Sequence, residues 1–78
     1  MSNMKQRSKL GQFLDTRAVN QAAIVRMTGI GKNRISELAK NEDARIKADE
    51  LYLIAKAIDA DPCKLLNLIC SDLQLTGN

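Results

Sequence analysis

The 78-residue sequence predicts an all-α fold, a compact five-helix bundle. No window alternates apolar and polar residues with β-branched enrichment, which is the pattern of a half-buried strand. Apolar residues instead recur every three or four positions, which is the period of an amphipathic helix. No repeat or linker divides the chain, so residues 1–78 are expected to form a single domain.

Three helices are expected before residue 42, of which the second and third are short. The first covers about residues 5–17, where apolar residues recur at i, i+3 and i+4: Leu10, Phe13 and Leu14. Asn20 is a good N-cap for the second helix, and Gly29 suits the positive φ that often follows a helix end. The third covers residues 31–41 and buries an apolar stripe: Ile35, Leu38 and Ala39.

Two further helices follow a polar loop of mixed charge. The fourth is expected to begin near Ala48, because two carboxylates in its first turn favour the helix dipole, and to end by Ala60. Asp61 and Pro62 then provide an N-cap and a proline at the first helical position. They open a fifth helix that continues to about Leu73.

The composition argues against several kinds of chemistry. The chain has no histidine, the commonest general base. Cys63 and Cys70 are too few for a closed four-ligand zinc site, and a separation of seven residues in a helix is too long for a disulfide. Phe13 and Tyr52, the two aromatic residues, are too few for a platform that stacks single-stranded bases. We therefore expect no enzyme, no metal site and no cofactor.

The sequence also carries no targeting signal. No apolar run approaches the 18 residues that a membrane span needs. The basic N-terminal start is not followed by the apolar stretch of a signal peptide. We therefore expect a cytoplasmic protein with no membrane partner.

Charge is divided unevenly along the chain. Residues 1–40 hold eight Lys or Arg against two Asp or Glu, a net charge of +6. Residues 41–78 hold four against seven, a net charge of −3. A basic half is what a phosphate-facing surface requires, although a solvated surface without a ligand would have the same charge.

The basic half contains a helix-turn-helix pattern at about residues 20–40. Two short helices are joined by a tight turn that Gly29 supplies. Ile24 and Ile35 are placed to meet between the two helices, and Leu38 anchors the helix over residues 31–41 to the core. The polar face of the helix over residues 31–41 is then free to enter a groove of DNA.

Most of the chain follows a longer pattern. A polar residue and a glutamine start the second helix, and the other matching residues are Gly29, Ile35, Leu38, Leu51, Ile54–Ile58 and Leu65–Leu66. In these features the sequence resembles the lambda-repressor-like helix-turn-helix family, which includes phage repressors and Cro proteins. Three residues depart from the usual family pattern: Val25, Thr28 and Gly31.

The start of the third helix points to the same site. Lys32 and Arg34 lie in its first turn, where the helix dipole disfavours cations. Local rules that are broken without compensation tend to mark functional positions, and anionic DNA would supply the compensation here. The alternative is that two exposed cations cost too little to matter.

Candidate DNA contacts follow from this placement. Lys32 can donate to guanine, Asn33 can pair with adenine, and Glu37 can accept from cytosine. The residues expected to read bases are Lys32, Asn33, Ser36 and Glu37. The family resemblance implies a phosphate contact for Gln21, and the full set expected to touch phosphate is Gln21, Arg34, Lys40, Asn41 and Arg45. Arg45 also suits a purely solvated position.

The fifth helix carries more apolar surface than one packed face needs. From Cys63 to Leu73 its apolar residues cover an arc of roughly 220°, against the ~100° that packing one face needs. We expect a second copy to cover the surplus, through Leu65, Leu68 and Cys70. The alternative is that the C-terminal residues fold back over the helix.

The sequence therefore predicts a sequence-specific regulator of transcription that binds double-stranded DNA. It would be a repressor or Cro-like protein, a homodimer that reads a palindromic operator with the helix near residues 31–40 in the major groove. Two alternatives remain open: an antitoxin that binds DNA and a toxin partner, or a protein-interaction module that has lost DNA binding.

Overall fold

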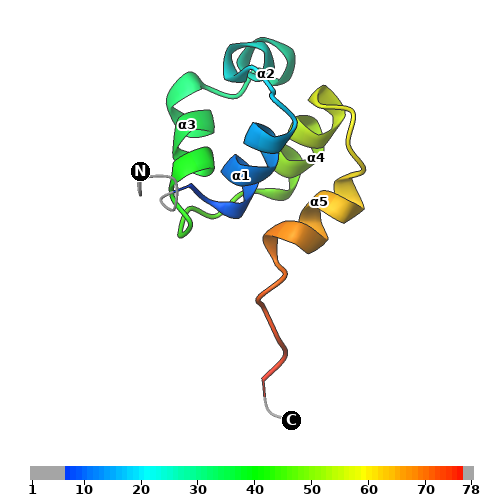
Figure 1. Cartoon of the computed structure of the whole chain (residues 1–78). Helices are drawn as coiled ribbons and strands as arrows, with labels where there is room; N and C mark the ends of the chain where they lie inside the picture. Colours follow the sequence, from blue (N-terminus) through cyan, green and yellow to red (C-terminus); the bar gives the residue numbers. More distant parts are fainter. Residues whose placement is uncertain (1–6, 77–78) are drawn as a thin grey trace.

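A computed structural model describes residues 7–76 of the chain (Figure 1). It contains five α-helices, α1 (Lys9–Thr16), α2 (Gln21–Thr28), α3 (Lys32–Lys40), α4 (Ala48–Ala57) and α5 (Pro62–Ile69). No residue between 7 and 76 belongs to a β-strand. The all-α, five-helix prediction is confirmed.

The N-terminal boundary of α1 is set by a buried serine. The expected start near residue 5 lies outside the described residues, and within them the helix begins at Lys9. The Ser8 hydroxyl accepts a hydrogen bond from the Gly11 N–H at 3.0 Å, which makes Ser8 the N-cap. Residues 7 and 8 therefore precede the helix.

The C-terminal boundary of α5 differs from the prediction. The helix ends at Ile69 rather than near Leu73, and a turn over residues 70–72 leads into an extended segment that leaves the bundle (Figure 1). The apolar spacing continues past Ile69, but the segment beyond it has little to pack against. Leu73 is 67% exposed and Leu75 is fully exposed. Most of a helix's stability comes from burying one face, so the sequence pattern alone does not extend it.

The core is a cluster of aliphatic side chains to which every helix contributes. α1 packs against α3 and α5, and α4 packs against α2 and α5. The buried apolar residues are Leu10, Leu14, Ile24, Ile35, Leu38, Ala39, Leu51, Ile54, Ala55, Ile58 and Leu65. Because α2 and α3 each bury one face in this cluster, their opposite faces remain outside it.

Lys9 ties α1 to two later segments. Its Nζ lies 3.2 Å from Oε2 of Glu42 in the α3–α4 loop and 3.3 Å from Oδ2 of Asp72 after α5. Its backbone N–H also donates to Oε1 of Glu42. These two carboxylates raise the pKa of Lys9, with the hydrogen bond to Glu42 as the main cause. One lysine thus connects three parts of the chain.

Two smaller expectations concern the helices and the thiols. None of the helices within residues 7–76 combines the length and the apolar character needed to cross a bilayer. Cys63 and Cys70 are free thiols, as their spacing predicts.

Candidate DNA-binding surface

The helix-turn-helix consists of α2, a three-residue turn and α3. Asn20 caps α2, because its Oδ1 accepts from the Ala22 N–H at 2.8 Å. Gly29 follows α2 with φ = 77°, and its N–H donates to the carbonyl of Val25 at 2.9 Å. The expected N-cap and the expected positive-φ glycine are both confirmed.

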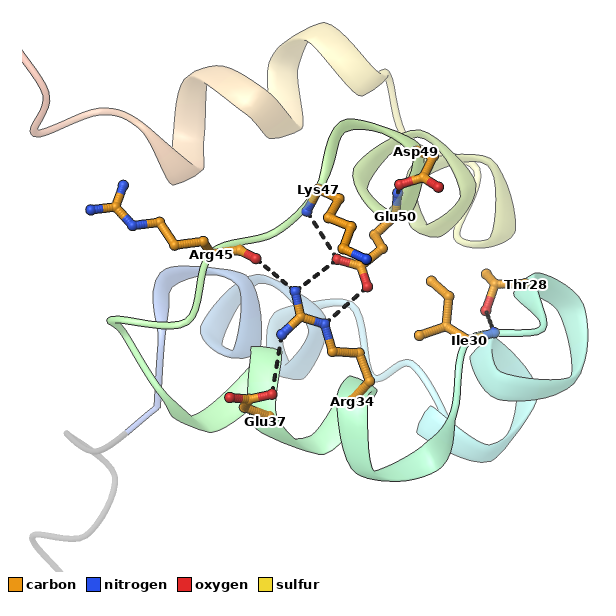
Figure 2. Close-up of polar contacts among 8 residues, drawn as sticks. All are labelled: Thr28, Ile30, Arg34, Glu37, Arg45, Lys47, Asp49 and Glu50. Carbon is orange, nitrogen blue, oxygen red and sulfur yellow. Dashed lines mark hydrogen bonds and ion pairs between the residues drawn. The ribbon is translucent and has the colours of Figure 1, made fainter.

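Thr28 has a structural role in this turn that the sequence analysis missed. Its Oγ1 donates to the Ile24 carbonyl at 2.7 Å. The same oxygen accepts from the Ile30 N–H at 3.1 Å (Figure 2). An aliphatic residue here could do neither. The hydroxyl therefore ties the last turn of α2 to the chain entering α3, and short serine and threonine turns of this kind are the signal that points to it.

α3 has one buried and one exposed face. Ile35, Leu38 and Ala39 are at most 3% exposed and pack into the core. Outside this buried stripe, the helix surface holds exposed Lys32, Asn33, Glu37 and Lys40 with half-buried Ser36. Because residues at i, i+4 and i+8 share one side of a helix, Lys32, Ser36 and Lys40 form a polar stripe, flanked by Asn33 and Glu37. We call this set the α3 polar face.

Arg34 lies where the sequence analysis did not expect it. Its guanidinium points toward α4, where Nε donates to Oε2 of Glu50 at 2.9 Å and Nη2 donates to Oε1 at 3.0 Å (Figure 2). Nη1 donates to Oε1 of Glu37 at 3.1 Å, and Nη2 also donates to the carbonyl of Arg45 at 2.6 Å. Four hydrogen bonds within the chain thus occupy the group that was expected to touch phosphate.

The contacts of Arg34 change the interpretation of the two cations at the start of α3. The Glu50 carboxylate, whose side chain is 11% exposed, compensates Arg34, so that cation is no longer unexplained. The hydrogen bonds from Arg34 are the main reason that the pKa of Glu50 is lowered, and Glu50 in turn raises the pKa of Arg34. Lys32 remains without an ion-pair partner among residues 7–76. Of the two cations in the first turn of α3, only Lys32 therefore still indicates an anionic partner such as DNA.

The other expected phosphate ligands lie at the start of α2, at the end of α3 and in the loop that follows α3. Gln21 is half-buried at the first position of α2, and Lys40 is exposed in the last turn of α3. Asn41 follows α3, and its Oδ1 accepts from the Asp43 N–H at 2.9 Å, so part of this amide shapes the loop. The side chain of Arg45 is exposed while its carbonyl is held by Arg34.

All five helices lie within the match to one known protein family. The family model of the Cro/C1-type HTH DNA-binding domain matches residues 9–71, a span from the start of α1 to just beyond α5. The chain belongs to this family. The Cro/C1-type match extends over α4 and α5 as well as α2 and α3, which confirms the resemblance drawn from the longer sequence pattern. No curated protein and no solved structure in the comparisons matches the chain.

The dimer residues expected for this Cro/C1-type domain do not share one surface. Leu65 is 1% exposed because it packs into the core, so its expected place in an interface is wrong. Leu68 is 36% exposed and lines a hollow with Phe13 and Thr16 of α1. Cys70 lines a different hollow, beside the α3–α4 loop. Of the three, Leu68 remains the candidate for contact with a second copy.

Proposed function

We propose that the chain is a cytoplasmic, sequence-specific regulator of transcription that binds double-stranded DNA, a repressor or Cro-like protein. It acts as a homodimer on a palindromic operator, with α3 in the major groove of each half-site. The supporting observation is the α3 polar face: side chains able to pair with base edges lie on α3 outside its buried core residues.

Within this proposal, Lys32 and Asn33 read bases. Both are exposed in the first turn of α3, and residues at the start of a recognition helix are those that reach base edges. A lysine can donate to O6 and N7 of guanine, and an asparagine can make two hydrogen bonds to adenine. Ser36 and Glu37 lie one turn later and face the same groove, although Glu37 is shared with Arg34.

Phosphate contacts come from the edges of the same surface. Gln21 from α2, Lys40 and Asn41 at the end of α3, and Arg45 in the loop would hold the DNA backbone and fix the register of α3. Arg34 is left out of this set because its donors are directed at Glu50, Glu37 and Arg45.

Selection of binding sites from random DNA duplexes tests the proposal. We expect a palindromic site whose half-site centres are about 34 Å apart, one turn of the double helix. Asn33→Ala should lose the preference at one position in each half-site, at a cost of about 1–3 kcal/mol per lost pair of hydrogen bonds. Asn67→Ala, a change at an exposed asparagine on α5, is the matched control and should select the wild-type site.

The outcome also separates the proposal from the protein-interaction alternative. If wild-type protein enriches no sequence and binds no duplex even at low salt, the chain does not act on DNA, and the protein-interaction alternative takes its place. If Asn33→Ala selects the same site with the same affinity, Asn33 does not read bases.

A further inference from the structure

Arg34 and Glu50 form a two-point ion pair between α3 and α4 (Figure 2). Arg34 lies in the first turn of α3, directly after Asn33, and Glu50 lies in the first turn of α4. The two side chains are 28% and 11% exposed. A paired guanidinium and carboxylate constrain orientation as well as distance, because two parallel hydrogen bonds hold both planes.

The same pair also holds the segment that leads into α4. Nη2 of Arg34 donates to the carbonyl of Arg45, and Oε1 of Glu50 accepts from the N–H of Lys47 at 2.9 Å. Residues 45–47 are therefore attached to the pair at both ends. The exposed side chains of Arg45 and Lys47 thus project from a backbone whose position relative to α3 depends on Arg34 and Glu50.

We propose that Arg34 and Glu50 are positioning residues for operator recognition, which set the spacing and angle between the α3 polar face and the basic segment 45–47 without contacting DNA. This inference rests on the proposed function. Four of the five N–H donors of Arg34 are already used within the chain. Moving the guanidinium to a phosphate would leave Glu50 as an unpaired, largely buried carboxylate, which is unfavourable.

The opposite hypothesis, that Arg34 binds a phosphate, predicts the reverse effect of one substitution. If Arg34 binds DNA, Glu50→Gln removes a competing carboxylate and a negative charge near DNA, and should tighten binding. If the pair positions the surface, Glu50→Gln should weaken binding to the operator by about tenfold, as expected for coupled residues in one network. Arg34→Lys separates the hypotheses again, since lysine is an adequate phosphate ligand but cannot form the two-point pair.

The experiment measures affinity for the selected operator and for a duplex altered in the bases that the wild type prefers. Wild type, Arg34→Lys, Glu50→Gln and the double variant are compared, each at a temperature where circular dichroism shows it folded. A loss of stability alone lowers the active fraction equally for both duplexes, so the ratio of the two affinities would stay constant. Misplacement of α3 relative to residues 45–47 lowers that ratio.

We expect both single variants to lower the ratio by similar factors and the double variant to be no worse than either. The slope of log K against log salt should change less in Glu50→Gln than in Lys40→Ala, because the Glu50 substitution removes no phosphate-binding side chain. Asp15→Asn is the matched control: it weakens the two-point pair between Arg7 and Asp15, which includes no residue of α3 or α4, and should leave the ratio unchanged.

Three results would overturn the inference. An unchanged ratio in both single variants shows that the pair does not position the surface. Tighter operator binding by Glu50→Gln, or full affinity in Arg34→Lys, assigns Arg34 to phosphate instead. Failure of wild-type protein to bind any duplex removes the proposed function and this inference with it, whereas the first two results leave DNA binding intact.

Discussion

The hydroxyl of Ser8 donates to the carbonyl of Leu38 at the end of α3, while it accepts from the N–H of Gly11 in α1. One buried side chain thus begins α1 and satisfies a carbonyl that the last turn of α3 leaves unpaired. The backbone N–H of Ser8 donates to the neighbouring carbonyl of Ala39 at 3.0 Å. The end of the proposed recognition helix is therefore held by the start of α1, so its position depends on how closely the two helices approach.

Gly11→Ala tests that close approach. A Cβ at residue 11 would lie 2.0 Å from the carbonyl oxygen of Ala39, and backbone atoms cannot yield cheaply. We expect the free energy of unfolding to fall by about 1–3 kcal/mol, despite the better helix propensity of alanine. Urea denaturation measures the change. A stability equal to that of the wild type would contradict the close packing.

Gly31→Ser should stabilise the protein. Gly31 is the N-cap of α3 with φ = −61° and ψ = 150°, a conformation that serine adopts readily. A serine hydroxyl there would accept from an unpaired N–H of the first turn and reduce the freedom of the unfolded chain. We expect a gain of about 0.5–1 kcal/mol, read as a higher midpoint in urea. A lower midpoint would mean that the cap geometry is unsuitable.

The Arg34–Glu50 pair predicts a pH dependence of stability. The pKa of Glu50 is lowered in the folded protein from its usual value near 4.5, mainly by hydrogen bonds from Arg34. Its carboxylate therefore stabilises the fold fully at neutral pH, and this contribution is lost as the pH falls below about 4.5 and through the folded-state pKa.

Glu50→Gln removes this dependence. Its free energy of unfolding should be lower than that of the wild type by about 1–3 kcal/mol at neutral pH, and the two should converge in acid. Urea titrations from about pH 7 to about pH 2 compare them. Curves that remain parallel over this range would show that Glu50 titrates alike in the folded and unfolded protein.

Lys40 is expected to position DNA without reading its sequence. A homodimer that neutralises about four to eight phosphates should give a slope of log K against log salt of roughly −4 to −7. Lys40→Ala should make this slope shallower by about two units in the dimer and leave the selected site unchanged. Lys64→Ala on α5 is the matched control, and it should leave the slope of the wild type intact. A changed site in Lys40→Ala would make Lys40 a base-reading residue.

Leu68→Glu is expected to give a folded monomer with much weaker operator binding. Leu68 is partly exposed beside α1, and a carboxylate in a contact between two copies would be desolvated without a partner. Light scattering gives the mass in solution. Leu66→Glu, a change at an exposed leucine two positions earlier on α5, should remain dimeric. A dimeric Leu68→Glu would place the interface elsewhere, and an unfolded one would assign Leu68 to the core.

The order and type of the helices could be predicted from local chemistry. Asn20, Asp61 and Gly29 act at helix ends through their own side chains or their own backbone freedom, so neighbouring residues are enough to identify them. The apolar stripes of α3 and α4 likewise follow from the helical period. The exposed residues of α3 are those that lie outside its apolar stripe.

The sequence determined the five helices, the helix-turn-helix and the exposed residues at the start of α3, because each depends on residues within one or two turns. Only the tertiary structure decided that α5 stops at Ile69 and that Leu65 belongs to the core, since both depend on which surfaces other helices cover. It also turned Arg34 from DNA toward Glu50, 16 residues away. The sequence pattern places a charged residue on its helix, but which residue it pairs with depends on how distant segments of the chain pack together.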